Sequence, residues 1–328
     1  MLKAVPQSLL DYIDDHGSFH IIGHKEPDGD CVGSQLALGS WLRRQGKRVN
    51  LCSAGPFTRT EIMPFEHRFS SVVPQEFGSE RVGAIILDCS SLHRIGSLAD
   101  SLPKMPLAFI DHHASGEAKG DVLYIDDTAP SVTLLVLALI EARGDKPTRE
   151  EADLLFFGLS TDTGFFRHLA DGSTETWEAA GRLVKAGASP KKIFAMMNGG
   201  KSLLSRKLMG EILSRVEPHF DGRLLVSHVT LDDQRRFGLA SRDSDMLYQL
   251  LLTVSGCESA MIIRQENETE CTVGLRSLER VDVGSIASRF GGGGHRLAAG
   301  LLIRGSMEEV RTLLVGAFEP AFKDVGFM

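Results

Sequence analysis

The chain has 328 residues, 42% of them hydrophobic and 24% charged, which is typical of a globular protein with more than one domain. Its formal net charge of −7 at pH 7 argues against a long basic groove that follows a nucleic acid. The longest apolar run, Val132–Ile140, is far shorter than the roughly 20 residues of a membrane helix, and Asp11, Asp14 and Asp15 interrupt any secretory signal. We therefore expect a soluble, cytoplasmic protein with no membrane partner.

From residue 19 to residue 125, short apolar runs alternate with helical patterns. The runs predict strands at Phe19–Gly23, Arg48–Cys52, Val82–Asp88, Leu107–Asp111 and Val122–Ile125. Helical spacing is present at Val32–Leu42, Ser131–Arg143, Arg149–Leu159 and Thr174–Ala186. This alternation predicts an α/β fold with a doubly wound, mainly parallel sheet and helices on both of its faces.

The pattern changes after Pro218. Strands are predicted at Leu224–Leu231, Ser259–Gln265 and Glu270–Arg276, and helices at Met246–Val254, Val283–Phe290 and Met307–Phe318. These elements predict a smaller α+β domain. The segment before them is basic and contains Gly199-Gly200, which indicates a helical linker with a hinge. The expected division is residues 1–188, a linker at 189–217, and residues 218–328, with an interdomain cleft.

Carboxylates or histidines follow four apolar runs of the first domain. The polar groups are His24, Asp28 and Asp30 after Phe19–Ile22, Asp88 after Ala84–Leu87, Asp111-His112-His113 after Leu107–Ile110, and Asp162 after Leu154–Leu159. Open α/β sheets bind ligands at the carboxyl ends of their strands, so these four segments are expected to converge at one edge. Any one of these residues alone is more often structural than catalytic.

The converging groups suit two divalent cations, because carboxylates favour hard ions and imidazoles favour manganese, iron or zinc. In the predicted arrangement, Asp88 bridges both ions. The first ion also takes His24 and Asp28, with Gly29 allowing the backbone to turn after Asp28. The second ion takes Asp30, His112 and Asp162. Two ions about 3.5–4 Å apart generate a nucleophilic hydroxide and hold a phosphoryl group in line, which is the chemistry of phosphoester hydrolysis.

The remaining members of the triplet have other predicted tasks. His113 lies beside a ligand but points elsewhere, so it is expected to contact the substrate phosphate or to protonate the leaving oxygen. Asp111 is expected to orient an imidazole. Five cysteines, Cys31, Cys52, Cys89, Cys257 and Cys271, form no Cys-x-x-Cys pair and are interpreted as reduced, buried thiols.

A glycine run in the second domain offers a second candidate site. Phe290 precedes four glycines and His295, and such a run can form an anion nest from free backbone N–H groups. Arg276 and Ser277 end a preceding strand and add a guanidinium fork. We therefore expect Arg276, Ser277, Gly293, Gly294 and His295 to bind the substrate. A flexible turn is the simpler interpretation of the glycines.

These motifs together resemble the DHH phosphoesterase superfamily with its DHH-associated domain 1 (DHHA1), and most of all its nanoRNase/pAp phosphatase (NrnA-like) subgroup. The resemblance rests on His24–Asp30, Asp88, Asp111-His112-His113, Thr161–Arg167, Arg276-Ser277 and the glycine run ending in His295. It implies a manganese-dependent hydrolase of short oligoribonucleotides and of 3′-phosphoadenosine 5′-phosphate (pAp). Cys31 stands where relatives often have a small apolar residue, and Gly274 where a Ser often precedes the Arg-Ser pair.

Other functions remain open from the sequence. A soluble phosphodiesterase of cyclic or linear dinucleotides would use the same motifs, and a catalytically inactive nucleotide-binding sensor belongs to a different class. Family II pyrophosphatases share the first-domain motifs, but the chain after residue 190 does not follow their pattern. RecJ-type exonucleases are much longer. The oligomeric state, a homodimer included, is also open.

Overall fold

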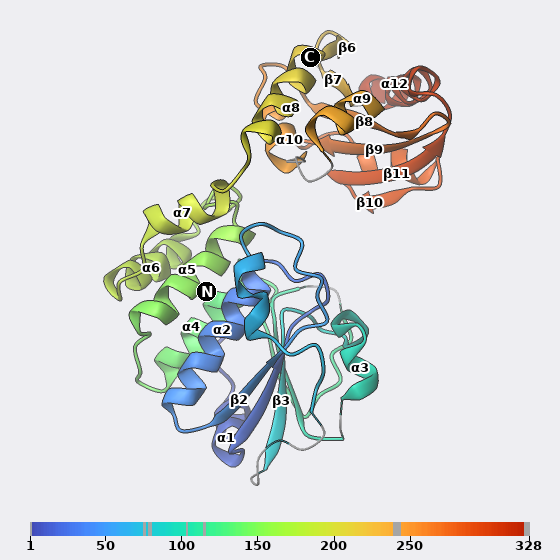
Figure 1. The fold of residues 1–328 in the computed structure, drawn as a ribbon. Coiled ribbons are helices and arrows are strands. Elements are labelled where there is room, and N and C mark those ends of the chain that lie inside the picture. The colour runs from blue at the N-terminus through green and yellow to red at the C-terminus, as the bar shows by residue number, and fades with distance from the viewer. Residues whose placement is uncertain are drawn as a thin grey trace. The chain divides into compact units, whose positions relative to one another are not determined.

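The chain divides into two units, Met1–Gly200 and Lys201–Met328 (Figure 1). The computed structural model describes residues 2–74, 77, 81–102, 104–113, 116–238 and 244–324. Each unit has its own sheet and its own hydrophobic core. The boundary between the units lies within the linker predicted at 189–217. Its helix α7 (Pro190–Asn198) belongs to the first unit, and its helix α8 (Leu203–Ser214) belongs to the second.

The first unit is built on a five-stranded parallel sheet in the order β2-β1-β3-β4-β5. The strands are β1 (Ser18–Ile22), β2 (Arg48–Cys52), β3 (Val82–Leu87), β4 (Leu107–Asp111) and β5 (Val122–Ile125). Each predicted strand is present, with ends that differ by at most one residue. Because β1 lies between β2 and β3, the strand order reverses there, and open parallel sheets bind ligands beside such a reversal.

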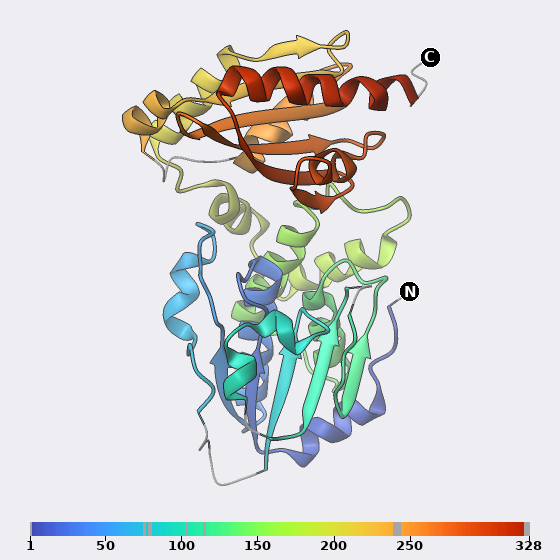
Figure 2. The ribbon, with the colours of Figure 1, turned by 90° about the vertical axis from the view of Figure 1, so that its right-hand side faces the viewer.

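Helices bury both faces of this sheet (Figure 2). They are α1 (Gln7–Asp15), α2 (Gly29–Arg44), α3 (Leu98–Ser101), α4 (Val132–Ala142), α5 (Arg149–Asp162), α6 (Thr174–Lys185) and α7, with short 3-10 helices at Met63–Arg68 and Leu92–Ile95. On one face, Leu36, Leu135 and Leu155 of α2, α4 and α5 pack in the core that also contains Phe19. On the other, Leu98 of α3 belongs to a smaller cluster. The predicted α/β class is confirmed, and burial on both faces explains why the strands are almost continuously apolar.

The second unit has a six-stranded mixed sheet in the order β10-β11-β9-β8-β7-β6. Its strands are β6 (Glu217–His219), β7 (Leu224–Val229), β8 (Ser259–Asn267), β9 (Glu270–Ser277), β10 (Gly293–His295) and β11 (Ala298–Arg304). β7 and β8 are parallel, and the other neighbours are antiparallel. Only β7, β8 and β9 were predicted. The strands β6 and β10 are three residues long, and β10 and β11 contain glycine, which is depleted in strands.

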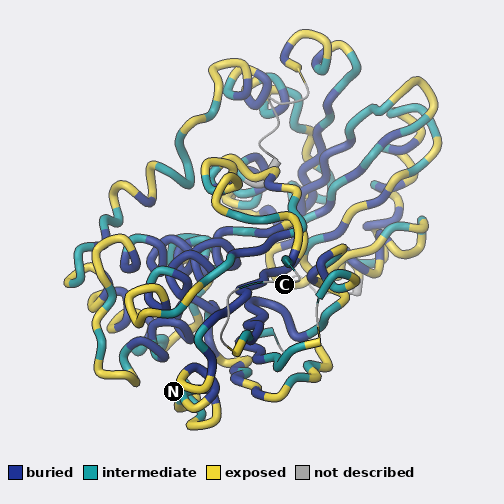
Figure 3. The backbone as a smooth tube through the Cα atoms, turned by 60° about the horizontal axis from the view of Figure 1, so that its bottom comes forward, coloured by how far each residue is buried: buried dark blue, intermediate teal, exposed yellow. Residues whose placement is uncertain are grey.

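Helices also cover both faces of the second sheet, and Figure 3 shows buried stretches of the backbone alternating with exposed loops. They are α8, α9 (Leu231–Phe237), α10 (Ser244–Leu252), α11 (Val283–Ser288) and α12 (Met307–Asp324). Leu208 of α8 and Leu247 of α10 share one core, while Ile286 of α11 and Leu314 of α12 share the other. Within the described part of the chain, no helix has the length and apolarity required to span a membrane.

Candidate metal centre

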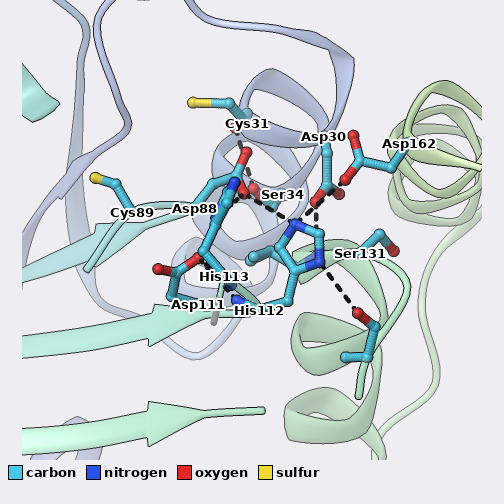
Figure 4. Close-up of polar contacts among 12 residues, drawn as sticks. Asp30, Cys31, Ser34, Asp88, Cys89, Asp111, His112, His113, Ser131 and Asp162 are labelled. Carbon is cyan, nitrogen blue, oxygen red and sulfur yellow. Dashed lines mark hydrogen bonds and ion pairs between the residues drawn. The ribbon is translucent and has the colours of Figure 1, made fainter. Parts of the chain in front are cut away.

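Asp88, just after β3, links histidines from two other segments (Figure 4). Its Oδ2 lies 3.4 Å from His24 Nε2, and its Oδ1 lies 3.5 Å from His112 Nε2. His24 Nε2 is also 3.8 Å from Asp28 Oδ1, and His112 Nε2 is 3.2 Å from Asp162 Oδ2. The structure therefore brings the predicted ligand segments into one cluster with Asp88 between its two halves.

The two imidazoles present their Nε2 atoms to this cluster. His24 Nδ1 lies 2.8 Å from the carbonyl oxygen of Lys25, and His112 Nδ1 lies 3.0 Å from that of Ala129. A carbonyl can only accept a hydrogen bond, so each Nδ1 carries a hydrogen. Each ring is thus oriented by the backbone with Nε2 toward the carboxylates, the arrangement in which histidine ligates metals.

Asp30, the second carboxylate of the first loop, is fully buried and fixed. Its Oδ2 accepts a hydrogen bond from the N–H of Val132 at 2.6 Å, and its Oδ1 accepts one from Thr133 at 3.0 Å. These donors belong to the first turn of α4, where the helix dipole favours negative charge. Donor atoms of Asp30, His112 and Asp162 lie within 4.8 Å of one another, which is the spacing of a second ion position.

Glycines let the elements that carry these ligands approach closely. A Cβ at Gly29 would lie 2.4 Å from Thr161 Cγ2, and one at Gly158 would lie 2.4 Å from Thr133 Cγ2. The start of α2 therefore packs against the end of α5 with no room for a side chain. The predicted role of Gly29, a turn in the backbone, is wrong: Gly29 is the first residue of α2, and close packing is what it provides.

Asp162 departs from the predicted placement at a strand end. The apolar run before it is a buried helix, α5, and Asp162 is in its last turn. Asp88 shows a second feature that the sequence did not indicate, a backbone φ of +61°. Left-handed backbone is uncommon outside glycine and, where it occurs, is concentrated at functional sites.

The charges of the cluster are unbalanced. Burial, together with the neighbouring carboxylates Asp162 and Asp88, raises the pKa of Asp30 well above its usual value. Burial by itself would lower the pKa of His112, but Asp162 and Asp88 outweigh it and raise the pKa to about 11. Asp88 Oδ1 and His112 Nε2 are buried without a hydrogen-bond partner. Four carboxylates around two imidazoles, with orphaned atoms aimed inward, therefore fit divalent cations.

Asp111 and His113 form a hydrogen-bonded pair at the side of the cluster, where His113 Nδ1 also lies 3.7 Å from Asp88 Oδ1. Asp111 Oδ1 lies 2.8 Å from His113 Nδ1, and Asp111 Oδ2 accepts a 2.5 Å hydrogen bond from Ser90 Oγ. Burial alone would raise the pKa of Asp111, but His113 and Ser90 lower it. The hydrogen bond to Asp111 in turn raises the pKa of His113. Asp111 thus holds His113 by Nδ1 and leaves Nε2 available to a substrate.

The predicted binding residues of the second unit have different surroundings. Arg276 lies over the Tyr248 ring, 4.7 Å from Cζ to the ring centroid, and lines a pocket of about 670 Å³ with Gly293 and Gly294. Ser277 is buried, and its hydroxyl donates to Glu258 at 2.9 Å. His295 is exposed at the end of β10. The structure therefore brings three of the five residues to one pocket.

The glycine run is not an open nest. The N–H groups of Gly291 and Gly292 bond to the carbonyl oxygens of Ser288 and Ala287 at the end of α11. Gly293–His295 pair with β11 as strand β10. The expectation of free N–H groups is thus wrong for the first two glycines, because they close a helix.

Several groups that position the site carry no signal in the sequence. Ser90, the carbonyl oxygen of Ala129 and the N–H groups of Val132 and Thr133 come from loops and a helix start with no motif of their own, and only the tertiary fold reveals them. Cys31 is a free, buried thiol as predicted, and its sulfur lies within 4.8 Å of donor atoms of His24 and Asp88, which the sequence did not indicate.

Fold and site together define a two-unit α/β protein with a candidate divalent-metal centre. Residues 18–159 match the DHH family, N-terminal domain, and residues 221–323 match the DHHA1 domain. The chain therefore belongs to the DHH family of phosphoesterases and carries its DHHA1 domain, as the resemblance predicted.

Three known proteins illustrate the likeness. The bifunctional oligoribonuclease and PAP phosphatase NrnA of Thermus thermophilus is 30% identical over 88% of this chain and 85% of its own length. The protein of the same description from Bacillus subtilis is 28% identical over 85% of this chain and 87% of its own. The crystal structure of an exopolyphosphatase-related protein from Bacteroides fragilis matches with a TM-score of 0.83 at 24% identity, covering 99% and 98% of the two chains. This last likeness shows the fold.

Proposed function

We propose that this DHH phosphoesterase hydrolyses short oligoribonucleotides, from dinucleotides to about pentanucleotides, to mononucleotides, and pAp to AMP and phosphate. The observation that carries the proposal is Asp88, which lies within 3.5 Å of His24 on one side and of His112 on the other. The names of the two NrnA relatives support the substrate class.

Seven ligand contacts are proposed for two manganese ions. The first ion position takes His24, Asp28 and Asp88, and the second takes Asp30, Asp88, His112 and Asp162. Manganese accepts both carboxylate oxygen and imidazole nitrogen. When bound, the two ions supply the hydroxide nucleophile and stabilise negative charge on the phosphoryl oxygens.

The protein's own contribution to bond cleavage centres on His113. Held at Nδ1 by Asp111, the ring donates a proton from Nε2 to the oxygen that leaves when the P–O bond breaks. Asp111 stabilises the protonated ring and keeps it aimed. Ser90 supports this by donating to the second oxygen of Asp111.

Arg276 is proposed to hold the remote part of the substrate, together with Gly293 and Gly294. A guanidinium recognises phosphate through two parallel hydrogen bonds, and that of Arg276 lies over the Tyr248 ring, 4.7 Å from Cζ to the ring centroid. Ser277 and His295 stay predictions as binding residues. The net charge of −7 offers no extended basic track, so additional nucleotides would gain little binding.

A turnover comparison tests the proposal. Purified protein with Mn²⁺ is given a dinucleotide, a pentanucleotide, a 24-mer RNA, pAp and cyclic-di-AMP. Fast release of mononucleotides from the two short RNAs and of phosphate from pAp is expected, with slow cleavage of the 24-mer. A preference for cyclic-di-AMP would assign the alternative dinucleotide phosphodiesterase function, and binding without any product would indicate a sensor.

A further inference from the structure

Cys31 places a sulfur atom inside the candidate metal centre. The residue is in the first turn of α2 and is fully buried. Its Sγ and donor atoms of His24 and Asp88 all lie within 4.8 Å of one another. Figure 4 shows Cys31 and Asp88 on one side of the cluster and Asp162 on the other. Donors that share one ion at bond lengths of about 2.0–2.3 Å lie about 3–4.5 Å apart, so only small adjustments would bring this sulfur into a common coordination sphere.

The position of the sulfur is fixed by its neighbours. Gln35 Nε2 donates to the carbonyl oxygens of Ile21 and Cys52, both at 3.0 Å, which turns Gln35 Oε1 toward Cys31 Sγ at 3.6 Å. A Cβ at Gly23 would lie 2.2 Å from this sulfur and 2.5 Å from Gln35 Oε1. Only glycine at position 23 leaves room for the thiol.

Simple packing is the competing explanation, and Cys89 shows what it looks like. Cys89 directly follows Asp88, but its thiol donates to the carbonyl oxygen of Leu87 at 3.7 Å and packs in an apolar cluster. Cys31 differs because its sulfur lies within 4.8 Å of donor atoms of His24 and Asp88, and Asp88, whose Oδ2 is 3.4 Å from His24 Nε2, is only 2% exposed. A buried carboxylate, an imidazole and a thiol whose donor atoms lie this close together point to an ion that all three share.

We propose that Cys31 Sγ is a fourth ligand of the first metal position, beside His24, Asp28 and Asp88, and that it gives this position a preference for thiophilic ions. Sulfur ligands favour Co²⁺, Zn²⁺ and Cd²⁺ over Mn²⁺. The thiol proton leaves to solvent as the sulfur–metal bond forms, and Gln35 Oε1 gives up its donor. The inference rests on the metal assignment of the proposed function.

Cobalt absorption tests the proposal without reference to activity. Co²⁺ is titrated into metal-free wild-type protein and into Cys31→Ala, Cys31→Ser and Cys89→Ala, with circular dichroism as the check on folding. Wild type and Cys89→Ala are expected to show visible d–d bands together with a near-ultraviolet sulfur-to-cobalt charge-transfer band. Both Cys31 variants should keep the d–d bands and lose the charge-transfer band.

Competition between Cd²⁺ and Mn²⁺ for the metal-free protein measures the preference of the first metal position for thiophilic ions. Cys31→Ser should weaken Cd²⁺ binding at the first position by at least about tenfold, since the loss of even an indirect partner of a ligand costs that much. The affinity for Mn²⁺ should change less than threefold.

The outcomes separate this inference from the proposed function. Visible d–d bands without charge transfer in wild type would mean that the thiol stays on Gln35, which overturns the role of Cys31 and leaves the metal centre standing. A charge-transfer band that disappears in Cys89→Ala instead would also overturn it. Failure of the wild type to bind cobalt at all would overturn both.

Discussion

Asp111 and His113 show how two ionisable residues of one triplet acquire different tasks. Asp111 is buried and receives hydrogen bonds from Ser90 and from two backbone N–H groups, while the side chain of His113 is 40% exposed. The buried carboxylate can therefore only orient, and the partly exposed ring can reach a substrate.

Replacing His113 separates proton donation from metal binding. His113→Ala is expected to retain both ions, because Nδ1 of this ring is already engaged by Asp111, and to lose roughly 10²–10⁴-fold in turnover. Activity on a dinucleotide and metal content measured on the same sample check this. A variant that has lost one ion would make His113 a ligand and contradict the division of tasks.

In the second unit, Gly274 is a single residue whose lack of a side chain is required by close packing. A Cβ there would lie 2.2 Å from the hydroxyl oxygen of Tyr248, so the hydroxyl occupies the space that a Ser would need. Gly274→Ala is expected to lower the free energy of unfolding by about 1–3 kcal/mol through overpacking. Removing that hydroxyl in Gly274→Ala/Tyr248→Phe should recover most of the loss.

Urea unfolding of the single and double variants measures this coupling. Gly210→Ala is the matched control, because a Cβ at Gly210 in α8 meets nothing within 4 Å and alanine favours the helix by roughly 0.5–1 kcal/mol. Equal destabilisation in the single and double variants would mean that Tyr248 is not the obstacle.

At the scale of elements, long apolar runs were predictable and short polar ones were not. The five strands of the first sheet were found to within one residue because burial on both faces leaves a continuous apolar signal. β10 was missed because Gly293 and Gly294 have no side chain to pack, and α5 was extended to Asp162 only by the structure.

In the candidate site too, only residues that follow a recognisable sequence pattern could be predicted. Residues inside the motifs, such as His24, Asp88 and His112, were found because their spacing after apolar runs carries a signal. Their supports were not, because the carbonyl oxygen of Ala129 has no side-chain identity and Ser90 resembles any surface serine. The sulfur of Cys31 was set aside because the sequence cannot show which face of α2 it occupies.

The ion pair between Asp233 and Arg215 at the start of α9 makes the stability of the fold depend on pH. The Asp233 carboxylate accepts hydrogen bonds from the N–H and the hydroxyl of Thr230 at the start of α9 and forms a salt bridge with Arg215 at 2.5 Å. Burial alone would raise the pKa of Asp233, but Arg215 and Thr230 lower it to about 2. A carboxyl whose pKa is lower in the folded state than in the unfolded state stabilises the fold at pH values above its unfolded pKa, here near 3.8. This stabilisation is lost as the pH falls toward the folded pKa of about 2.

The expected contribution of Asp233 is about 2 kcal/mol at neutral pH. Wild type and Asp233→Asn should differ by about this amount in urea unfolding at pH 7, and the difference should shrink between about pH 5 and pH 2. A difference that stays constant over this range would show that the charge of Asp233 is not its source.

On the scale of the whole molecule, chemistry and recognition are assigned to different units. All proposed metal ligands belong to residues 1–200, and Arg276 with its pocket belongs to residues 201–328. A substrate without a remote part should therefore depend only on the first unit.

Arg276→Ala tests this separation. Hydrolysis of a dinucleotide and of pAp should fall by about 10-fold or more, the worth of a charge-assisted hydrogen bond, whereas hydrolysis of bis-p-nitrophenyl phosphate should change little. Arg304→Ala, at the far end of β11, is the matched control. Equal losses on both kinds of substrate would contradict the assignment of recognition to Arg276.

The most direct test of the central claim is a count of manganese ions bound per chain in wild type and in Asp88→Ala. Asp88 is the one carboxylate proposed for both positions, so wild type should bind two ions, and the folded variant should bind at most one and lose more than nine-tenths of its turnover at saturating manganese. Two ions in Asp88→Ala with a tenth or more of wild-type activity would contradict a shared ligand and, with it, the two-metal centre described above.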